Sequence, residues 1–289
     1  MTGDDRRPVV DLRRYSCAFF DVDGTVVVGS TPTPGAPEFV AACRRAGLAV
    51  GFITNASMRT PAELLALLER AGVAEPGDYV LTSAVALAQK VRIDGYREIL
   101  CAGHSGLSSA LAAAGLVVHD AADTSVAAVE ERRGRLAVAL GLFPDQLPAV
   151  RPVLEAALSA GCPCYVPTLE RSWPTPDGLR PGNGATVDVL RETVDVQPIM
   201  CGKPSAVFAA ALRTMTGGPR AALVVGDTWA VDVALARAQG WDSLLTLTGT
   251  TAADPDRPWM NAGDAGRPWT SAGAPTYVAS CLADVIVRT

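Results

Sequence analysis

The segment Phe20-Asp21-Val22-Asp23-Gly24-Thr25 places two carboxylates at the end of a predicted strand over residues 15–20. Side chains at positions i and i+2 of a strand project to the same side, so Asp21 and Asp23 are expected together at its carboxyl end. Two like charges this close are costly unless a cation lies between them, and Mg²⁺ prefers oxygen ligands. The motif predicts a magnesium site, although two acids at a strand end also occur in ordinary turns.

Three later segments also place polar residues after predicted strands. Phe52-Ile53-Thr54-Asn55-Ala56-Ser57 supplies donors that could hold phosphate oxygens or cap the next helix. Cys201-Gly202-Lys203-Pro204-Ser205 contains one of only two lysines in the chain, which either neutralises an anion or lies on the surface. The segment from Val224 to Asp232 ends a strand at Asp227, favoured as a metal ligand, although Asp227 or Asp232 could instead cap a helix.

Short apolar runs alternate with amphipathic stretches at both ends of the chain. We expect strands at 15–20, 48–53, 79–82, 221–225 and 243–247, and helices at 38–46, 61–71, 84–91 and 231–239. This alternation predicts an α/β fold with a Rossmann-like parallel sheet and helices on both faces. Ligands of such sheets bind at the carboxyl ends of the strands, where the polar segments lie.

The middle of the chain is expected to form an inserted second domain. Strands are predicted at 98–102, 117–119, 136–140 and 164–166, helices at 107–114 and 147–160, and a Pro- and Gly-rich loop at 168–184. The expected division is an N-terminal extension at 1–14, a core at 15–88 and 184–289, and an α/β insertion at 89–183. A short repeat, Arg-Pro-Trp-x-x-Ala-Gly, occurs at 257–263 and 267–273, and we expect an exposed loop there, or else a lid or interface segment.

Composition argues against several classes of protein. Hydrophobic residues make up 49% of the 289 residues and the net charge is −5, with no basic tract, so nucleic-acid binding is not expected. No apolar run approaches the ~18 residues of a membrane span, and the start of the chain does not resemble a signal peptide. The seven cysteines are odd in number and lack zinc-site spacing, which favours a reduced, cytoplasmic protein.

The four polar segments, in this order, resemble the motifs of the haloacid dehalogenase-like (HAD) superfamily of Asp-dependent phosphohydrolases. The insertion is similar to the α/β C2-type cap of that superfamily. The stretches at 181–185 and 247–251 are similar to the NagD-like branch, which includes 4-nitrophenylphosphatases. The resemblance covers roughly residues 15–251 and implies a HAD core domain carrying a cap domain.

The resemblance also implies a mechanism. Asp21 would be the nucleophile that forms an aspartyl-phosphate, and Asp23 the general acid and then the general base. Mg²⁺ would be held by Asp21, the backbone carbonyl of Asp23 and Asp227. Thr54 would bind the transferring phosphoryl group, and Lys203 would stabilise its charge and that of Asp21.

Further residues are implied around this centre. Asp232 would support the metal site or Lys203 from behind. The implied substrate-binding residues are Asn55, Ser57, Glu170, Arg171 and Trp173. The expected function is Mg²⁺-dependent hydrolysis of a small organic phosphate monoester, such as a sugar phosphate or related metabolite. The alternatives are a catalytically silent ligand-binding or regulatory protein and a phosphotransferase, and the resemblance allows a homodimer formed through the cap.

Overall fold

The computed structural model describes residues 7–141, 144–175, 178–249 and 273–289. The chain divides into two compact units. The first unit contains the described residues among 1–54, 61–81 and 212–289, and the second contains those among 55–60 and 82–211. The second unit therefore extends further on both sides than the insertion expected at 89–183.

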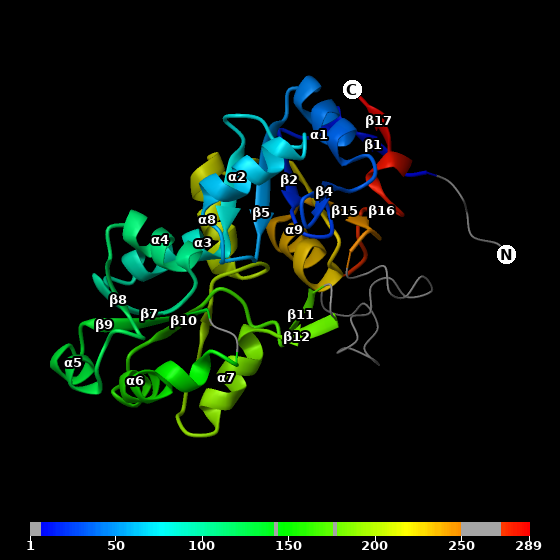
Figure 1. The fold of residues 1–289 in the computed structure, drawn as a ribbon. Coiled ribbons are helices and arrows are strands. Elements are labelled where there is room, and N and C mark those ends of the chain that lie inside the picture. Colours follow the sequence, from blue (N-terminus) through cyan, green and yellow to red (C-terminus); the bar gives the residue numbers. More distant parts are fainter. Residues whose placement is uncertain (1–6, 142–143, 176–177, 250–272) are drawn as a thin grey trace. The chain divides into compact units, whose positions relative to one another are not determined.

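A six-stranded sheet forms the centre of the first unit, in the order β16-β15-β14-β2-β5-β6 (Figure 1). Its strands are β2 (Cys17–Asp21), β5 (Ala49–Thr54), β6 (Tyr79–Thr82), β14 (Ala222–Gly226), β15 (Asp242–Thr246) and β16 (Tyr277–Ala279). β2 pairs in parallel with β14 on one side and β5 on the other. Every residue of β2 and β14 is buried, as expected for inner strands of a sheet covered on both faces.

Helices α1 (Ala36–Arg45), α2 (Pro61–Arg70) and α9 (Ala234–Gln239) belong to this unit, and α8 (Ala206–Thr216) crosses the boundary between the units. The ring of Phe20 packs against the rings of Phe39 and Phe52 in the core. Smaller strands complete the unit. β1 (Val9–Asp11) pairs in parallel with β17 (Ile286–Arg288), and β3 (Val27–Val28) pairs with β4 (Thr31–Pro32).

The second unit contains a five-stranded sheet in the order β13-β10-β9-β7-β8. Its strands are β7 (Glu98–Gly103), β8 (Val117–Asp120), β9 (Leu136–Gly141), β10 (Cys164–Val166) and β13 (Ile199–Met200). Alternate residues of β7 and β9 enter two different apolar clusters, because successive side chains of a strand point to opposite faces. Helices α3 (Ser83–Ile93) and α4 (Ser105–Ala113) cover one face, and α5 (Val126–Glu131), α6 (Leu147–Ser159) and α7 (Asn183–Arg191) cover the other (Figure 1).

The expected α/β class is confirmed, and the predicted strands lie within one or two residues of their expected ends. The prediction of a loop over 168–184 was wrong. This stretch contains the antiparallel hairpin β11 (Ser172–Thr175) and β12 (Gly178–Pro181), and α7 begins at Asn183. The Asn183 Nδ2 donates to the Thr168 carbonyl at 2.9 Å, which fixes the start of this helix against the preceding chain.

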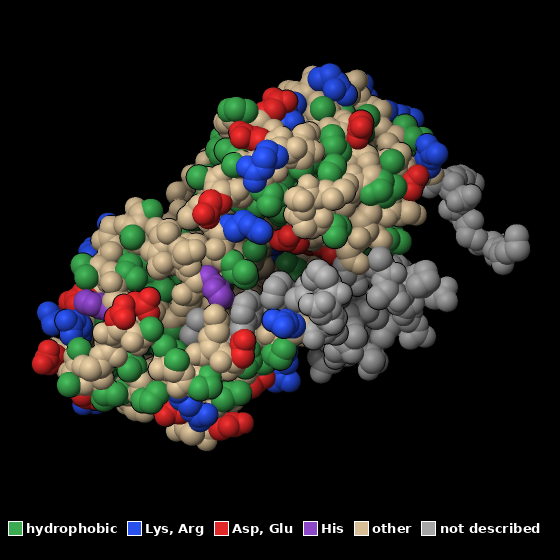
Figure 2. All heavy atoms as spheres, in the orientation of Figure 1, with side chains coloured by type: hydrophobic (Ala, Val, Ile, Leu, Met, Phe, Trp, Pro, Cys, Tyr) green, Lys and Arg blue, Asp and Glu red, His purple; other side chains and the backbone are tan. Residues whose placement is uncertain are grey.

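The sequence repeat at 257–263 and 267–273 lies almost entirely within residues 250–272, outside the described residues. The exposed loop, lid or interface segment expected there therefore stays a prediction. Among the residues that are described, no helix has the length and apolarity needed to cross a membrane. Acidic and basic side chains are interspersed over the face of the molecule drawn in Figure 2. This mixture agrees with the nearly balanced numbers of acidic and basic residues in the sequence.

Candidate active site

Three carboxylates meet at the carboxyl end of the first unit's sheet. Asp21 is the last residue of β2, Asp227 follows β14, and Asp232 lies on the π-helical turn Trp229–Val233. One carboxylate oxygen from each lies within 4.8 Å of the others. Their residues are only 8%, 2% and 2% exposed, so their charges repel one another in a poorly solvated place. A hard divalent cation such as Mg²⁺ fits this set of oxygen donors.

The strand register explains how acids so distant in sequence come together. Phe20 of β2 is paired with Val225 of β14, and Asp21 and Asp227 follow these residues at the same edge of the sheet. Asp232 returns to this edge because the π-helical turn inserts an extra residue, with the Ala234 N–H donating to the Trp229 carbonyl. The two expected metal ligands, Asp21 and Asp227, are therefore neighbours, and the Asp232 carboxylate lies beside them.

Two threonines hold these acids by hydrogen bonds. Thr25 is fully buried, and its hydroxyl lies 3.2 Å from Asp21 Oδ2 and 3.5 Å from Asp227 Oδ1. The Thr228 hydroxyl donates to Asp227 Oδ1 at 3.3 Å, and the Thr228 N–H donates to Asp232 Oδ2 at 3.1 Å. Neither threonine had a predicted role. The sequence signal for such a role is the position of each threonine, since Thr25 closely follows Asp21 and Asp23, and Thr228 directly follows Asp227.

Glycines allow the backbone to approach the acids closely. A Cβ added to Gly249 would lie 2.0 Å from Asp227 Oδ2, and one added to Gly24 would lie 2.8 Å from the same atom. A Cβ on Gly226 would lie 2.2 Å from Asp232 Cγ. Any larger residue at these positions would displace a carboxylate, so the acid cluster depends on the three glycines.

Asp23 and Thr54 lie at the same edge of the sheet in different surroundings. Asp23 is exposed, so its side chain is open to solvent, while Thr54 at the end of β5 is only 3% exposed. Asp21 is paired with Ile53, so Thr54 lies one residue beyond this pair on the neighbouring strand. An accessible acid and a buried hydroxyl thus flank the acid cluster of the first unit.

The other predicted site residues belong to the second unit. Lys203 is 2% exposed, and its peptide N–H and carbonyl both contact the Asn55 side chain. Asn55 also donates to Glu170 at 3.4 Å. Ser57 is half-buried.

Two predicted substrate contacts lie further along the same unit. The Arg171 side chain is 78% exposed and pairs with Asp188 at 2.9 Å. Trp173 lies on β11, but its side chain falls outside what the structure describes.

The buried cysteines are poorly suited to nucleophilic chemistry. Six of the seven are buried. Burial raises the pKa of the Cys43, Cys101 and Cys201 thiols to about 12. A thiol with so high a pKa carries almost no thiolate near neutral pH, so these three cysteines are poor nucleophiles.

Comparison with known proteins identifies the family. Residues 18–117 match the model described as haloacid dehalogenase-like hydrolase, and residues 200–285 match the model of HAD-like hydrolases. Together the two matches span more than half of the chain. The chain belongs to the haloacid dehalogenase-like hydrolases. The family expected from the four motifs is therefore confirmed, and these motifs lie in or beside the matched regions.

Relatives of this HAD-like hydrolase include the D-glycerol 3-phosphate phosphatase of Mycobacterium tuberculosis, 32% identical over 83% of this chain and 65% of the relative. A magnesium complex of the glycerol phosphate phosphatase from that organism has a TM-score of 0.75 at 29% identity, covering 94% of this chain and 77% of the other. The acid sugar phosphatase of Staphylococcus saprophyticus is 27% identical, over 84% of this chain and 90% of the relative. The 4-nitrophenylphosphatase of Thermotoga maritima shares the fold, with a TM-score of 0.74, 23% identity and coverage of 94% and 97%.

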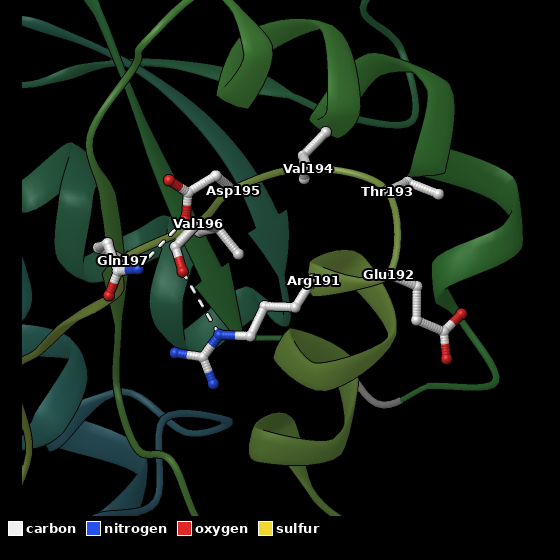
Figure 3. A pocket seen from close by; sticks show the side chains of 7 residues that line it. All are labelled: Arg191, Glu192, Thr193, Val194, Asp195, Val196 and Gln197. Carbon is white, nitrogen blue, oxygen red and sulfur yellow. Dashed lines mark hydrogen bonds between the residues drawn. The ribbon is translucent and has the colours of Figure 1, made fainter.

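The second unit of this HAD-like hydrolase also has an open hollow of about 460 Å³, whose lining contains none of the predicted site residues. It is lined by the continuous segment 191–197, which follows α7 (Figure 3). Within this segment the Arg191 side chain donates to the Val196 carbonyl, and Gln197 donates to Asp195. Because none of the lining residues is a predicted site residue and the acid cluster lies in the other unit, this hollow is not the candidate active site.

Proposed function

We propose that the protein is a Mg²⁺-dependent phosphatase that hydrolyses a small organic phosphate monoester through an aspartyl-phosphate on Asp21. The observation that carries the proposal is the cluster of Asp21, Asp227 and Asp232, three buried carboxylates within 4.8 Å of one another at the carboxyl end of a parallel sheet. Two of the relatives described above are named D-glycerol 3-phosphate phosphatase and acid sugar phosphatase, and a related structure contains magnesium.

Asp21, Asp227 and the Asp23 carbonyl are the proposed ligands of Mg²⁺. When bound, the ion supplies positive charge that lowers the repulsion between an anionic nucleophile and an anionic phosphate. Asp232 supports this set, because one of its oxygens accepts the Thr228 N–H and is thereby oriented.

The protein residues then divide the reaction into two steps. An Asp21 oxygen forms a bond to phosphorus while the bond from phosphorus to the ester oxygen breaks, and Asp23 gives its proton to the departing alkoxide. Asp23 next accepts a proton from water as that water attacks phosphorus, which releases inorganic phosphate and restores Asp21. Thr54, the Asn55 backbone N–H and Lys203 are proposed to bind the phosphoryl oxygens and stabilise their charge.

The substrate is proposed to be a sugar phosphate or a related polyol phosphate. We propose that the second unit acts as the cap and that Ser57, Glu170, Arg171 and Trp173 contact the substrate. The names of the relatives support this substrate class. We also propose a homodimer through the cap and a cytoplasmic location, the latter supported by seven unpaired thiols.

A phosphate-release screen tests the function. The purified chain is assayed with glycerol phosphate, sugar phosphates, nucleotides and 4-nitrophenyl phosphate, with Mg²⁺ and with a chelator. We expect release only with Mg²⁺, highest for one polyol or sugar phosphate, and lost in Asp21→Asn. Absence of release from every substrate would refute a phosphatase, and phosphorylated alcohol in place of free phosphate would identify a phosphotransferase.

A further inference from the structure

The Asn55 side chain forms a two-point contact with the backbone of Lys203. Its Oδ1 accepts the Lys203 N–H at 2.7 Å, and its Nδ2 donates to the Lys203 carbonyl at 3.1 Å. One planar amide thus satisfies both peptide groups of the same residue. Only Asn and Gln carry a donor and an acceptor in this arrangement, so Ser, Thr or Asp cannot reproduce both bonds.

The surrounding chain fits closely around this contact. A Cβ on Gly202 would lie 2.5 Å from Asn55 Oδ1 and 2.3 Å from the Pro167 carbonyl oxygen, so no larger residue fits before Lys203. On the other side, the buried Ser83 hydroxyl donates to the Asn55 carbonyl at 2.7 Å. Neighbouring groups therefore hold both Asn55 and the segment before Lys203 in place. Lys203 itself is only 2% exposed.

Asn55 also reaches the segment that was predicted to contact the substrate. Its Nδ2 donates to Glu170 Oε1 at 3.4 Å. The Glu170 backbone is anchored in turn, because its N–H donates to the Thr168 hydroxyl at 3.1 Å and its carbonyl accepts the Gly184 N–H at 2.9 Å. One amide group thus joins the peptide of Lys203 to the turn that carries Glu170.

We infer that Asn55 is a positioning residue, whose side chain holds the Lys203 peptide in place and ties it to Glu170. This inference rests on the proposed function, in which Lys203 stabilises phosphoryl charge. A lysine is a point charge on a flexible stem, so fixing its backbone reduces the freedom that must be lost when the ammonium binds phosphate. The Asn55 side chain then contributes to catalysis through Lys203, separately from any contact of its backbone with the substrate.

The test compares Asn55→Ala, Asn55→Asp, Lys203→Met and the double variant Asn55→Ala/Lys203→Met. Asn55→Asp retains the acceptor for the Lys203 N–H but loses both donated bonds. Tyr165→Phe is the matched control, because it removes another hydrogen bond of the second unit, the 2.6 Å bond from Tyr165 to Asp94. Each variant is measured for kcat and KM with 4-nitrophenyl phosphate and Mg²⁺, and for thermal unfolding.

We expect Asn55→Ala to lower kcat by about 10- to 100-fold, the scale of an ångström-sized misplacement of a catalytic group. In the Lys203→Met background the same substitution should cause no further loss, whereas Tyr165→Phe should lower stability and leave kcat unchanged. Equal losses in the presence and absence of Lys203 would overturn the inference, as would full activity of both Asn55 variants.

A second readout does not depend on turnover. Lys90 and Lys203 are the only lysines, so protein labelled with ¹³C-lysine gives two sets of side-chain signals, which Lys203→Met assigns. We expect Asn55→Ala and Asn55→Asp to shift the Lys203 signals and leave those of Lys90 in place. If wild-type protein releases no phosphate, the proposed function fails, and unchanged Lys203 signals in both variants would separately refute the positioning role.

Discussion

Replacing Gly249 by Ala is expected to disable the metal site by displacing the Asp227 carboxylate. The added Cβ would lie 2.0 Å from Asp227 Oδ2 and 2.9 Å from the Gly24 Cα. Ordinary contact begins at 3.4 Å, so the Asp227 carboxylate must retreat by about 1.4 Å, because the Gly24 backbone blocks movement the other way. The Thr248 hydroxyl, which donates to the Gly24 carbonyl at 2.6 Å, further restrains this segment.

The expected costs are about 1–3 kcal/mol of stability from overpacking and about a hundredfold in kcat/KM from the displaced acid. The assay is phosphate release as a function of Mg²⁺ concentration, in which Gly249→Ala should raise the concentration needed for half-maximal rate. Gly103→Ala is the matched control, because its Cβ would lie 2.7 Å from the end of the flexible Leu107 side chain in the other unit. A Gly249→Ala protein with the wild-type rate and Mg²⁺ requirement would refute this reasoning.

Further perturbations address the acids, their hydroxyl partner and the thiols. Asp21→Asn should lower kcat by at least about a thousandfold while the protein stays folded, as measured by single-turnover kinetics and circular dichroism. Thr25→Val should reduce stability by about 1 kcal/mol and lower kcat, because the hydroxyl shared by Asp21 and Asp227 is lost, and unchanged kcat would argue against that sharing. Mg²⁺ at 100 times its dissociation constant should stabilise the wild type by about 2.7 kcal/mol. Asp227→Asn should melt at a higher temperature than the wild type without metal and lose the response to Mg²⁺ in calorimetry. Burial raises the pKa of Cys43 and Cys101 in the folded protein to about 12. In the unfolded chain the same thiols therefore lose their protons at a lower pH than in the folded protein. The free energy of unfolding should therefore fall as pH rises from about 8.5 towards about 12, and a flat urea-unfolding profile between about pH 8 and pH 10 would contradict this.

The sequence located the acid cluster because its signals are local. Asp21 and Asp227 each end an apolar run that is long enough to be a buried strand, and parallel pairing then brings such ends to one edge. The approach of Asp232 to them had no comparable signal. It depends on a π-helical turn, and the apolar spacing of residues 231–239 predicted an ordinary helix beginning later.

The second unit was harder to predict at its end than in its strands. Strands β7 and β9 are continuous apolar runs, whereas the stretch over 168–184 has a composition typical of loops. Helix α7 begins inside Pro- and Gly-rich sequence, and its start is fixed by the long-range bond from Asn183 to Thr168. The contact of Asn55 with Lys203 joins residues 148 positions apart, and no pattern in the chain indicates such a pair.

The π-helical turn Trp229–Val233 makes chain length, as well as residue type, a condition of this site. An α-helix advances by about 100° for each residue, since it has 3.6 residues per turn. Deleting one residue from this turn would restore regular helical winding and rotate Asp232 by roughly a quarter of a turn relative to β14. A graft of this helix from a protein without the additional residue would keep every acid in the sequence and still misdirect one of them.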